Sequence, residues 1–189
     1  ADSLTVDGIV EISSTTPTLR FFETDQTDEG TLLRSAGDSF QIAKMLDTGA
    51  ADGIRLAIDQ SSGDISFYND SGNQGLFWDS SASSLGIGTT AVSSFAINDL
   101  VVGSGSSANG MTIYSASTSE GIIRFADGTS GIQQYAGQVK YNHSNDSLNF
   151  YTNGSGTSRL ALDSSGNATF SGSVTAGAIS GTSLSIDTL

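Results

Sequence analysis

The stretch Arg55-Leu56-Ala57-Ile58-Asp59-Gln60-Ser61-Ser62-Gly63-Asp64 joins a strand pattern to a turn pattern. Leu56 and Ile58 alternate with smaller or polar neighbours, which is the period-two pattern of a β-strand with one buried face. The residues after Asp59 are Gln, Ser, Gly and Asp, which favour tight turns. This stretch therefore predicts a β-strand that ends in a turn.

The same pattern returns 104 residues later as Arg159-Leu160-Ala161-Leu162-Asp163-Ser164-Ser165-Gly166-Asn167. Leu19-Arg20-Phe21 returns at the same offset as Ile123-Arg124-Phe125, and after a one-residue deletion Phe67 matches Phe170. The chain thus carries two copies of one β-rich unit, which is typical of rods, solenoids and arrays. Such a repeat favours a structural or adhesive role.

Period-two alternation predicts strands throughout both copies. In the first copy we expect strands at 3–12, 18–23, 39–46, 54–59 and 65–68, with a hairpin that turns at 35–38. In the second we expect them at 122–126, 138–141, 148–152, 159–163 and 168–171. Phe40 and Ala43 have helical spacing, but their counterpart segment is strand-like, so we predict a strand there too. The expected fold class is all-β, built from antiparallel meanders.

Four parts are expected along the chain. They are a first module at 1–90, a connecting neck with a strand at 91–111, a second module at 112–171, and a shaft strand at 172–189 that leads into a further unit. The last residues of the chain resemble residues 3–8, so we expect this piece to belong to a longer array.

Composition indicates an ordered protein with a thin core. Ser and Gly make up 56 of the 189 residues, and Ile, Leu, Val and Phe only 44. Ordering the backbone costs about 1–2 kcal/mol per residue, so a module of this kind is marginal as a monomer. We therefore expect identical chains to share their apolar surfaces.

Charge and cysteine content narrow the classes of partner. The net charge is −13, and the seven basic residues are scattered singly. No Lys/Arg stripe can displace counterions from phosphate, so nucleic acid and anionic membrane surfaces are not expected partners. No apolar run is long enough to predict membrane insertion. The chain has no cysteine, which excludes disulfides and thiolate chemistry.

Catalytic motifs are weak. The single histidine, His143, lies in a polar run that predicts an exposed turn, and no nucleophile motif accompanies it. Paired carboxylates could hydrolyse glycosides, but most acidic residues sit where we expect turns, where they bond backbone N–H groups. These are Asp25, Asp28, Asp47, Asp52, Asp64 and Asp70. We assign no catalytic residue and expect a non-enzymatic protein.

Binding motifs are equally weak, and we assign no cofactor or metal site. Residues 59–64 superficially match a calcium loop but lack its alternating ligands and final glutamate. Residues 86–90 are glycine-rich without the lysine of a phosphate loop. Trp78 and Phe21-Phe22 could form a sugar-stacking platform, but core or interchain packing explains them better.

Several stretches resemble the β-repeats of bacteriophage tail fibres and tailspikes. They are Ile123-Arg124-Phe125-Ala126-Asp127-Gly128-Thr129, residues 139–154 and 159–167, the short Gly86-Ile87-Gly88-Thr89-Thr90 motif that separates units in those fibres, and the small-residue segment 172–186. The resemblance is weaker over 24–51. It implies a parallel homotrimer extended along a three-fold axis with interleaved strands. It implies no catalytic residue.

Three hypotheses follow. The first is a structural segment of a phage tail fibre, located in the virion and extracellular, whose partners are two further copies, other tail proteins and host cell-surface polysaccharide. In it, Phe21, Phe67, Phe125 and Phe150 would pack between chains. The second is a saccharide-binding or polysaccharide-degrading tailspike module. The third is a bacterial surface adhesin stalk.

Overall fold

The computed structural model describes residues 6–21, 30–46, 48–178 and 181. The chain divides into two compact units, Ala1–Met111 and Thr112–Leu189. Each unit contains one β-sheet, and the described residues form no α-helix. The expected all-β, antiparallel class is confirmed.

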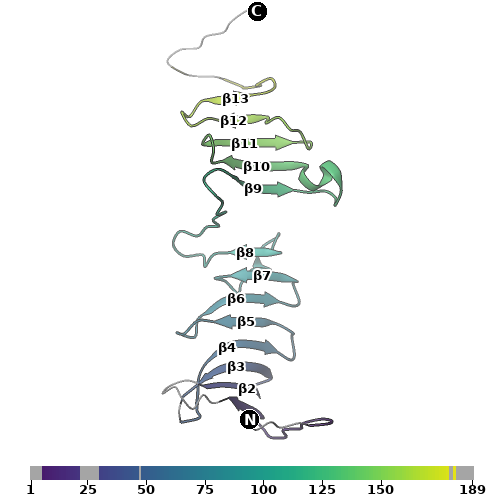
Figure 1. Ribbon diagram of the computed structural model, residues 1–189, viewed down its shortest axis with the longest axis vertical. Helices are drawn as coiled ribbons and strands as arrows, with labels where there is room; N and C mark the ends of the chain where they lie inside the picture. Colours follow the sequence, from purple (N-terminus) through teal and green to yellow (C-terminus); the bar gives the residue numbers. More distant parts are fainter. Residues whose placement is uncertain (1–5, 22–29, 47, 179–180, 182–189) are drawn as a thin grey trace, which may run out of the picture. The chain divides into compact units, whose positions relative to one another are not determined.

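The first unit holds an eight-stranded sheet in which spatial order follows chain order (Figure 1). Its strands are β1 (Thr18–Phe21), β2 (Gly30–Ala36), β3 (Ser39–Met45), β4 (Ala51–Asp59), β5 (Ile65–Tyr68), β6 (Gln74–Asp79), β7 (Ser84–Ile87) and β8 (Leu100–Val102). All neighbouring pairs are antiparallel except β7 and β8, which are parallel. A short 3₁₀ turn, η1 (Val92–Ser94), lies in the connection between those two strands.

The second unit holds a five-stranded antiparallel meander, again in chain order (Figure 1). Its strands are β9 (Glu120–Phe125), β10 (Gly137–Asn142), β11 (Ser147–Thr152), β12 (Leu160–Leu162) and β13 (Ala168–Phe170). A 3₁₀ helix, η2 (Gly131–Tyr135), is inserted between β9 and β10.

The two sheets repeat each other in register as well as in strand order. Leu33 pairs with Ile42 and Ile42 with Leu56 in the first sheet. The equivalent ladder in the second sheet is Val139 to Phe150 to Leu160. Strands β9 to β13 thus correspond to β1 to β5, with offsets of 104, 106, 108, 104 and 103 residues. The insertions before β10 and before β11 therefore fall in the connections, whereas the β3–β4 pair differs from β11–β12 by being longer and carrying β-bulges.

The β2–β3 hairpin shows how the turns follow from the sequence. Ala36 pairs with Ser39, so only Gly37 and Asp38 form the turn. Both have a positive φ of 57°, as a tight turn matched to the strand twist requires. Asp146, at the equivalent position before β11, also has a positive φ, 51°. The predicted hairpin at 35–38 is confirmed.

One face of each sheet is apolar, and we call it the apolar face. Directly paired residues point to the same side of a sheet, and residues two apart along a strand do likewise. In the first sheet this face carries one row of Leu19, Leu33, Ile42, Leu56, Phe67, Leu76, Ile87 and Val102, and beside it a row of Ser35, Phe40, Ile58, Ile65, Trp78, Leu85 and Leu100.

The second sheet has the same arrangement on a smaller scale. Its apolar rows are Ile123, Val139, Phe150, Leu160 and Phe170, and Gly121, Tyr141, Leu148, Leu162 and Ala168. Neither sheet has a second sheet or an α-helix packed on it among the described residues. Many of these side chains remain exposed, including Phe67 at 44% and Phe170 at 51%.

The opposite, polar face holds the most buried side chains of the first sheet. Leu32 pairs with Ala43, and together with Met45 they form a small core in which no side chain is more than 2% exposed. Beside it, Gln41 accepts a hydrogen bond from Arg34 Nε at 2.7 Å and donates to Ser39 Oγ at 2.7 Å. Polar side chains on this face therefore pair with one another.

Most predicted strands are confirmed, including the one at 39–46, which forms β3. The prediction at 3–12 is wrong for the described residues 6–12, which form no strand because no neighbouring strand pairs with them. Segment 91–111 contributes β8 to the first sheet and belongs to the first unit. Of the shaft segment 172–189, the described residues 172–178 and 181 form no strand, and the rest lies outside the described residues.

Candidate functional site

The apolar face of each sheet is a candidate interaction surface. The four phenylalanines expected to pack between chains all lie on them: Phe21 on β1, Phe67 on β5, Phe125 on β9 and Phe150 on β11. Three are exposed, at 52% for Phe21, 44% for Phe67 and 60% for Phe125. Exposed apolar surface that is contiguous over many strands typically marks an interaction site.

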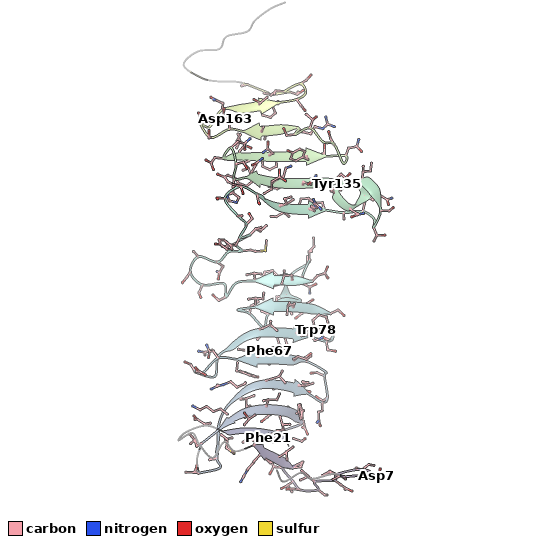
Figure 2. All side chains as sticks on the ribbon, viewed as in Figure 1. Asp7, Phe21, Phe67, Trp78, Tyr135 and Asp163 are labelled. Atoms are coloured by element: carbon pink, nitrogen blue, oxygen red, sulfur yellow. The ribbon has the colours of Figure 1, made fainter. Side chains whose placement is uncertain are left out.

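Trp78 and Phe21 do not form a common platform. Both lie on the apolar face of the first sheet, but on β6 and β1, which four strands separate (Figure 2). At about 4.8 Å per strand, that separation is too large for one sugar ring to contact both. Trp78 instead lies between Ile65 and Leu85 in the apolar row. Phe22 lies outside the described residues.

His143 lies in the turn between β10 and β11, as expected, but it is half-buried. Its ring meets that of Tyr141 edge-on, with 4.8 Å between centroids. Both residues line an apolar hollow of about 260 Å³ on the apolar face of the second sheet, with Ile113 and Val139. The ring of His143 is thus part of an apolar surface.

Acidic side chains mostly complete turns. Asp59 accepts hydrogen bonds from the Ser61 and Ser62 backbone N–H groups, both at 2.8 Å, and from the Ser61 hydroxyl at 2.6 Å. These bonds, the Ser61 hydroxyl first, lower the pKa of Asp59 to about 2. The Asp64 carboxylate accepts from the Ser80 N–H at 2.8 Å.

Asp163, the counterpart of Asp59, uses the same chemistry with different partners. It accepts from the backbone N–H groups of Ser165 at 2.9 Å and of Asn167 at 2.8 Å, and from the Asn167 side-chain amide at 2.8 Å. The Asn167 bonds lower the pKa of Asp163 below its ordinary value. These carboxylates are occupied by the turn itself, as residues 59–64 led us to expect.

Two other acidic residues pair with cations. Asp52 lies 3.6 Å from Lys44 and Asp70 lies 2.7 Å from Arg55, and all four line a pocket of about 650 Å³. The expectation that Asp52 sits in a turn is wrong, because β4 begins at residue 51 and continues through a β-bulge. Asp25, Asp28 and Asp47 lie outside the described residues.

The glycine-rich motif at 86–90 reverses the chain. Gly86 lies on the polar face of β7, and a Cβ added there would collide with the Thr89 carbonyl and lie 2.9 Å from Val92 Cγ1. Val92 is fully buried beneath the strand. Glycine at residue 86 therefore allows the chain to fold back under β7 before it returns as β8.

No group of three or more His, Asp and Glu side chains in the described ranges is placed to hold a metal ion. Nor does any helix in this part of the chain reach the length and hydrophobicity needed to cross a membrane. Comparison of the chain with protein-family models, with curated proteins and with solved structures finds no match.

Proposed function

We propose that this chain is a structural, non-enzymatic segment of a bacteriophage tail fibre. Three parallel copies associate through their apolar faces into an elongated trimer that supports or contributes to host attachment in the virion. The observation that carries the proposal is found in each sheet separately: an unbroken apolar row crosses every strand of that sheet and stays partly exposed in the single chain.

The energetics favour association. Complete burial of a large apolar side chain contributes about 1.5–3 kcal/mol. Only four apolar residues of the described chain are buried, Leu32, Ala43, Met45 and Val92, which is few for a protein of this length. Covering the apolar faces would supply the missing burial. The choice of three copies comes from the resemblance of the repeats to trimeric fibres.

Two adjacent residues on β13 offer a matched test. Phe170 is on the apolar face, Thr169 is on the polar face, and both are exposed in the single chain. Phe170→Asp would place a carboxylate in each interface, where an unpaired charge is costly. Thr169→Asp adds the same charge to the opposite side and is the control.

The experiment measures the mass of the chain and of both variants by light scattering coupled to size-exclusion chromatography. Light scattering should give the unchanged chain and Thr169→Asp a mass three times the monomer mass of 19.3 kDa. Phe170→Asp should dissociate at concentrations where the control remains assembled. A monomeric unchanged chain would contradict the proposal, as would equal behaviour of the two variants.

A further inference from the structure

A polar and aromatic pocket lies on the polar face of the second sheet. It has a volume of about 250 Å³ and is lined by Arg124, Tyr135, Gln138, Lys140, Tyr151 and residues 154–156. Sites for drug-sized ligands typically have volumes of about 300–1,000 Å³. The volume of this pocket is slightly smaller, so the pocket suits a single small ring. No aliphatic side chain lines it.

The strand register assembles the pocket. Arg124 pairs with Gln138 and Gln138 pairs with Tyr151, so the three side chains form one row across β9, β10 and β11. Lys140 is two residues beyond Gln138 on β10, on the same face. Tyr135 comes from the end of η2, beside these strands (Figure 2).

The two cations of the pocket differ in how they are held. Lys140 Nζ lies 3.0 Å from the Glu120 carboxylate and 4.7 Å from the centroid of the Tyr151 ring. Arg124 Cζ lies 5.9 Å from the Tyr135 ring centroid, and among the described residues its guanidinium has no ion pair or hydrogen bond. Arg124 is also exposed, so it is available to an anion, whereas Lys140 is already paired.

The first copy shows that the sheet forms without polar side chains at the ladder positions of Gln138 and Tyr151. The ladder positions of Gln138 and Tyr151 are occupied there by Leu32 and Ala43, which form a closed core with exposed fractions of 2% and 1%. In the second copy the same row is open and carries hydrogen-bonding groups. Packing explains the first arrangement, and a ligand would explain the second.

We propose that this pocket binds a carboxylated sugar unit of an acidic polysaccharide. A guanidinium recognises a carboxylate through two parallel hydrogen bonds. The Gln138 amide and the tyrosine hydroxyls can bond sugar hydroxyls, and aromatic rings can cover the C–H face of a sugar. An apolar side chain of a peptide would find no aliphatic wall among the lining residues.

This inference goes beyond the fibre proposal and does not require it. The pocket lies on the face opposite the apolar rows, so a trimer formed through those rows leaves it open. The net charge of −13 opposes polyanions at long range, so each site should bind weakly and better as salt rises from very low values. Several sites on one assembly would raise the overall avidity.

The test is binding of the full chain to an array of uronate- and sialate-containing oligosaccharides, each paired with its methyl ester, which lacks only the charge. Free oligosaccharide titrated into labelled protein then gives the affinity of each hit. We expect acidic glycans to bind and their methyl esters to bind at least about tenfold more weakly, the effect of one lost charged hydrogen bond. An array without any acid-dependent binding would overturn the proposal.

Arg20 provides the matched control, because it occupies on β1 the ladder position that Arg124 occupies on β9. Arg124→Ala should weaken binding at least about tenfold and Tyr151→Ala should weaken it as well, whereas Arg20→Ala should change it less than about twofold. Circular dichroism should be the same for both arginine variants, because both side chains are exposed.

Three further results would overturn the saccharide assignment. One is displacement of the glycan by inorganic phosphate at concentrations where the methyl ester does not compete, which would indicate a general anion site. Another is equal loss of binding in Arg20→Ala and Arg124→Ala, which would indicate an effect of net charge. Tighter binding of an acidic peptide than of any glycan would also reject it.

Discussion

The two sheets share one ladder but fill its polar face in opposite ways. In the first sheet, Leu32, Ala43 and Met45 close that face into a small apolar core. In the second, Gln138 and Tyr151 occupy the positions of Leu32 and Ala43 and line an open pocket. The apolar rows, by contrast, have the same character in both sheets.

The apolar rows are alike in the two sheets, whereas the polar faces differ, so the two faces are under different constraints. Leu19, Leu33 and Ile42 in one sheet, and Ile123, Val139 and Phe150 in the other, keep the apolar rows continuous. A surface that stays apolar although it is exposed in the single chain is consistent with a shared packing role. The polar face has changed between copies, so it is where a binding function can be added.

The largest effect is expected from charges on the apolar faces. Phe67 and Phe170 hold equivalent positions, opposite Leu56 and Leu160. Phe67→Asp and Phe170→Asp should each abolish assembly, because either variant buries unpaired carboxylates. Analytical ultracentrifugation measures both. A trimer that survives only Phe67→Asp would show that the second sheet alone associates.

Core truncation should distinguish the polar faces. Leu32→Ala should lower the free energy of unfolding by about 2–5 kcal/mol, as for other buried leucines. Gln138→Ala, at the equivalent position, should cost less than about 1 kcal/mol because its surroundings are open. Urea unfolding followed by Trp78 fluorescence reports on the first sheet, and hydrogen exchange reports on the second. Equal losses would contradict the proposed difference.

The reversal after β7 has no counterpart among the described residues of the second unit, and Gly86→Ala probes it. The new methyl group would meet the Thr89 carbonyl and Val92, so we expect a loss of about 1–3 kcal/mol in unfolding free energy. Gly75→Ala is the control, since nothing lies within 4 Å of a Cβ added there. A Gly86→Ala variant as stable as the control would disprove the tight contact.

The smallest effect concerns the matched turns at Asp59 and Asp163. Because the folded pKa of Asp59 is about 2, below the ordinary 3.8, its hydrogen bonds stabilise the fold fully above about pH 4 and are lost as the pH falls towards 2. Carboxyl ¹³C NMR should give that midpoint. Ser61→Ala should raise the pKa of Asp59 and leave that of Asp163 unchanged. An ordinary midpoint in the unchanged chain would contradict this turn geometry.

Local patterns predicted most of the fold because alternation and turn residues act over a few positions. Gly37 and Asp38 marked their hairpin, and the alternation at 65–68 marked β5. The strand expected at 3–12 failed over 6–12, since alternation cannot supply a partner strand. The direction of β8 was equally hidden, because Leu100-Val101-Val102 reads the same in a parallel or an antiparallel pair.

Aligning the two copies by sequence does not reveal the pocket, and the reason is geometric. At the constant offset of 104, Gln138 aligns with Arg34 and Tyr151 with Asp47. The true ladder offsets are 106 for β10 and 108 for β11, which match these residues to Leu32 and Ala43 instead. Only strand pairing reveals that a core pair in one copy corresponds to a polar pair in the other.

Those changing offsets have a practical consequence. A single extra residue inside a strand would turn every later side chain to the other side of the sheet. Here, the gains of two residues before β10 and before β11 lie between strands and leave the pairing intact, whereas the difference of four residues before β12 coincides with β-bulges in the longer β3–β4 pair. The bends between strands, such as that at 143–146, are therefore natural places to graft foreign peptides for display.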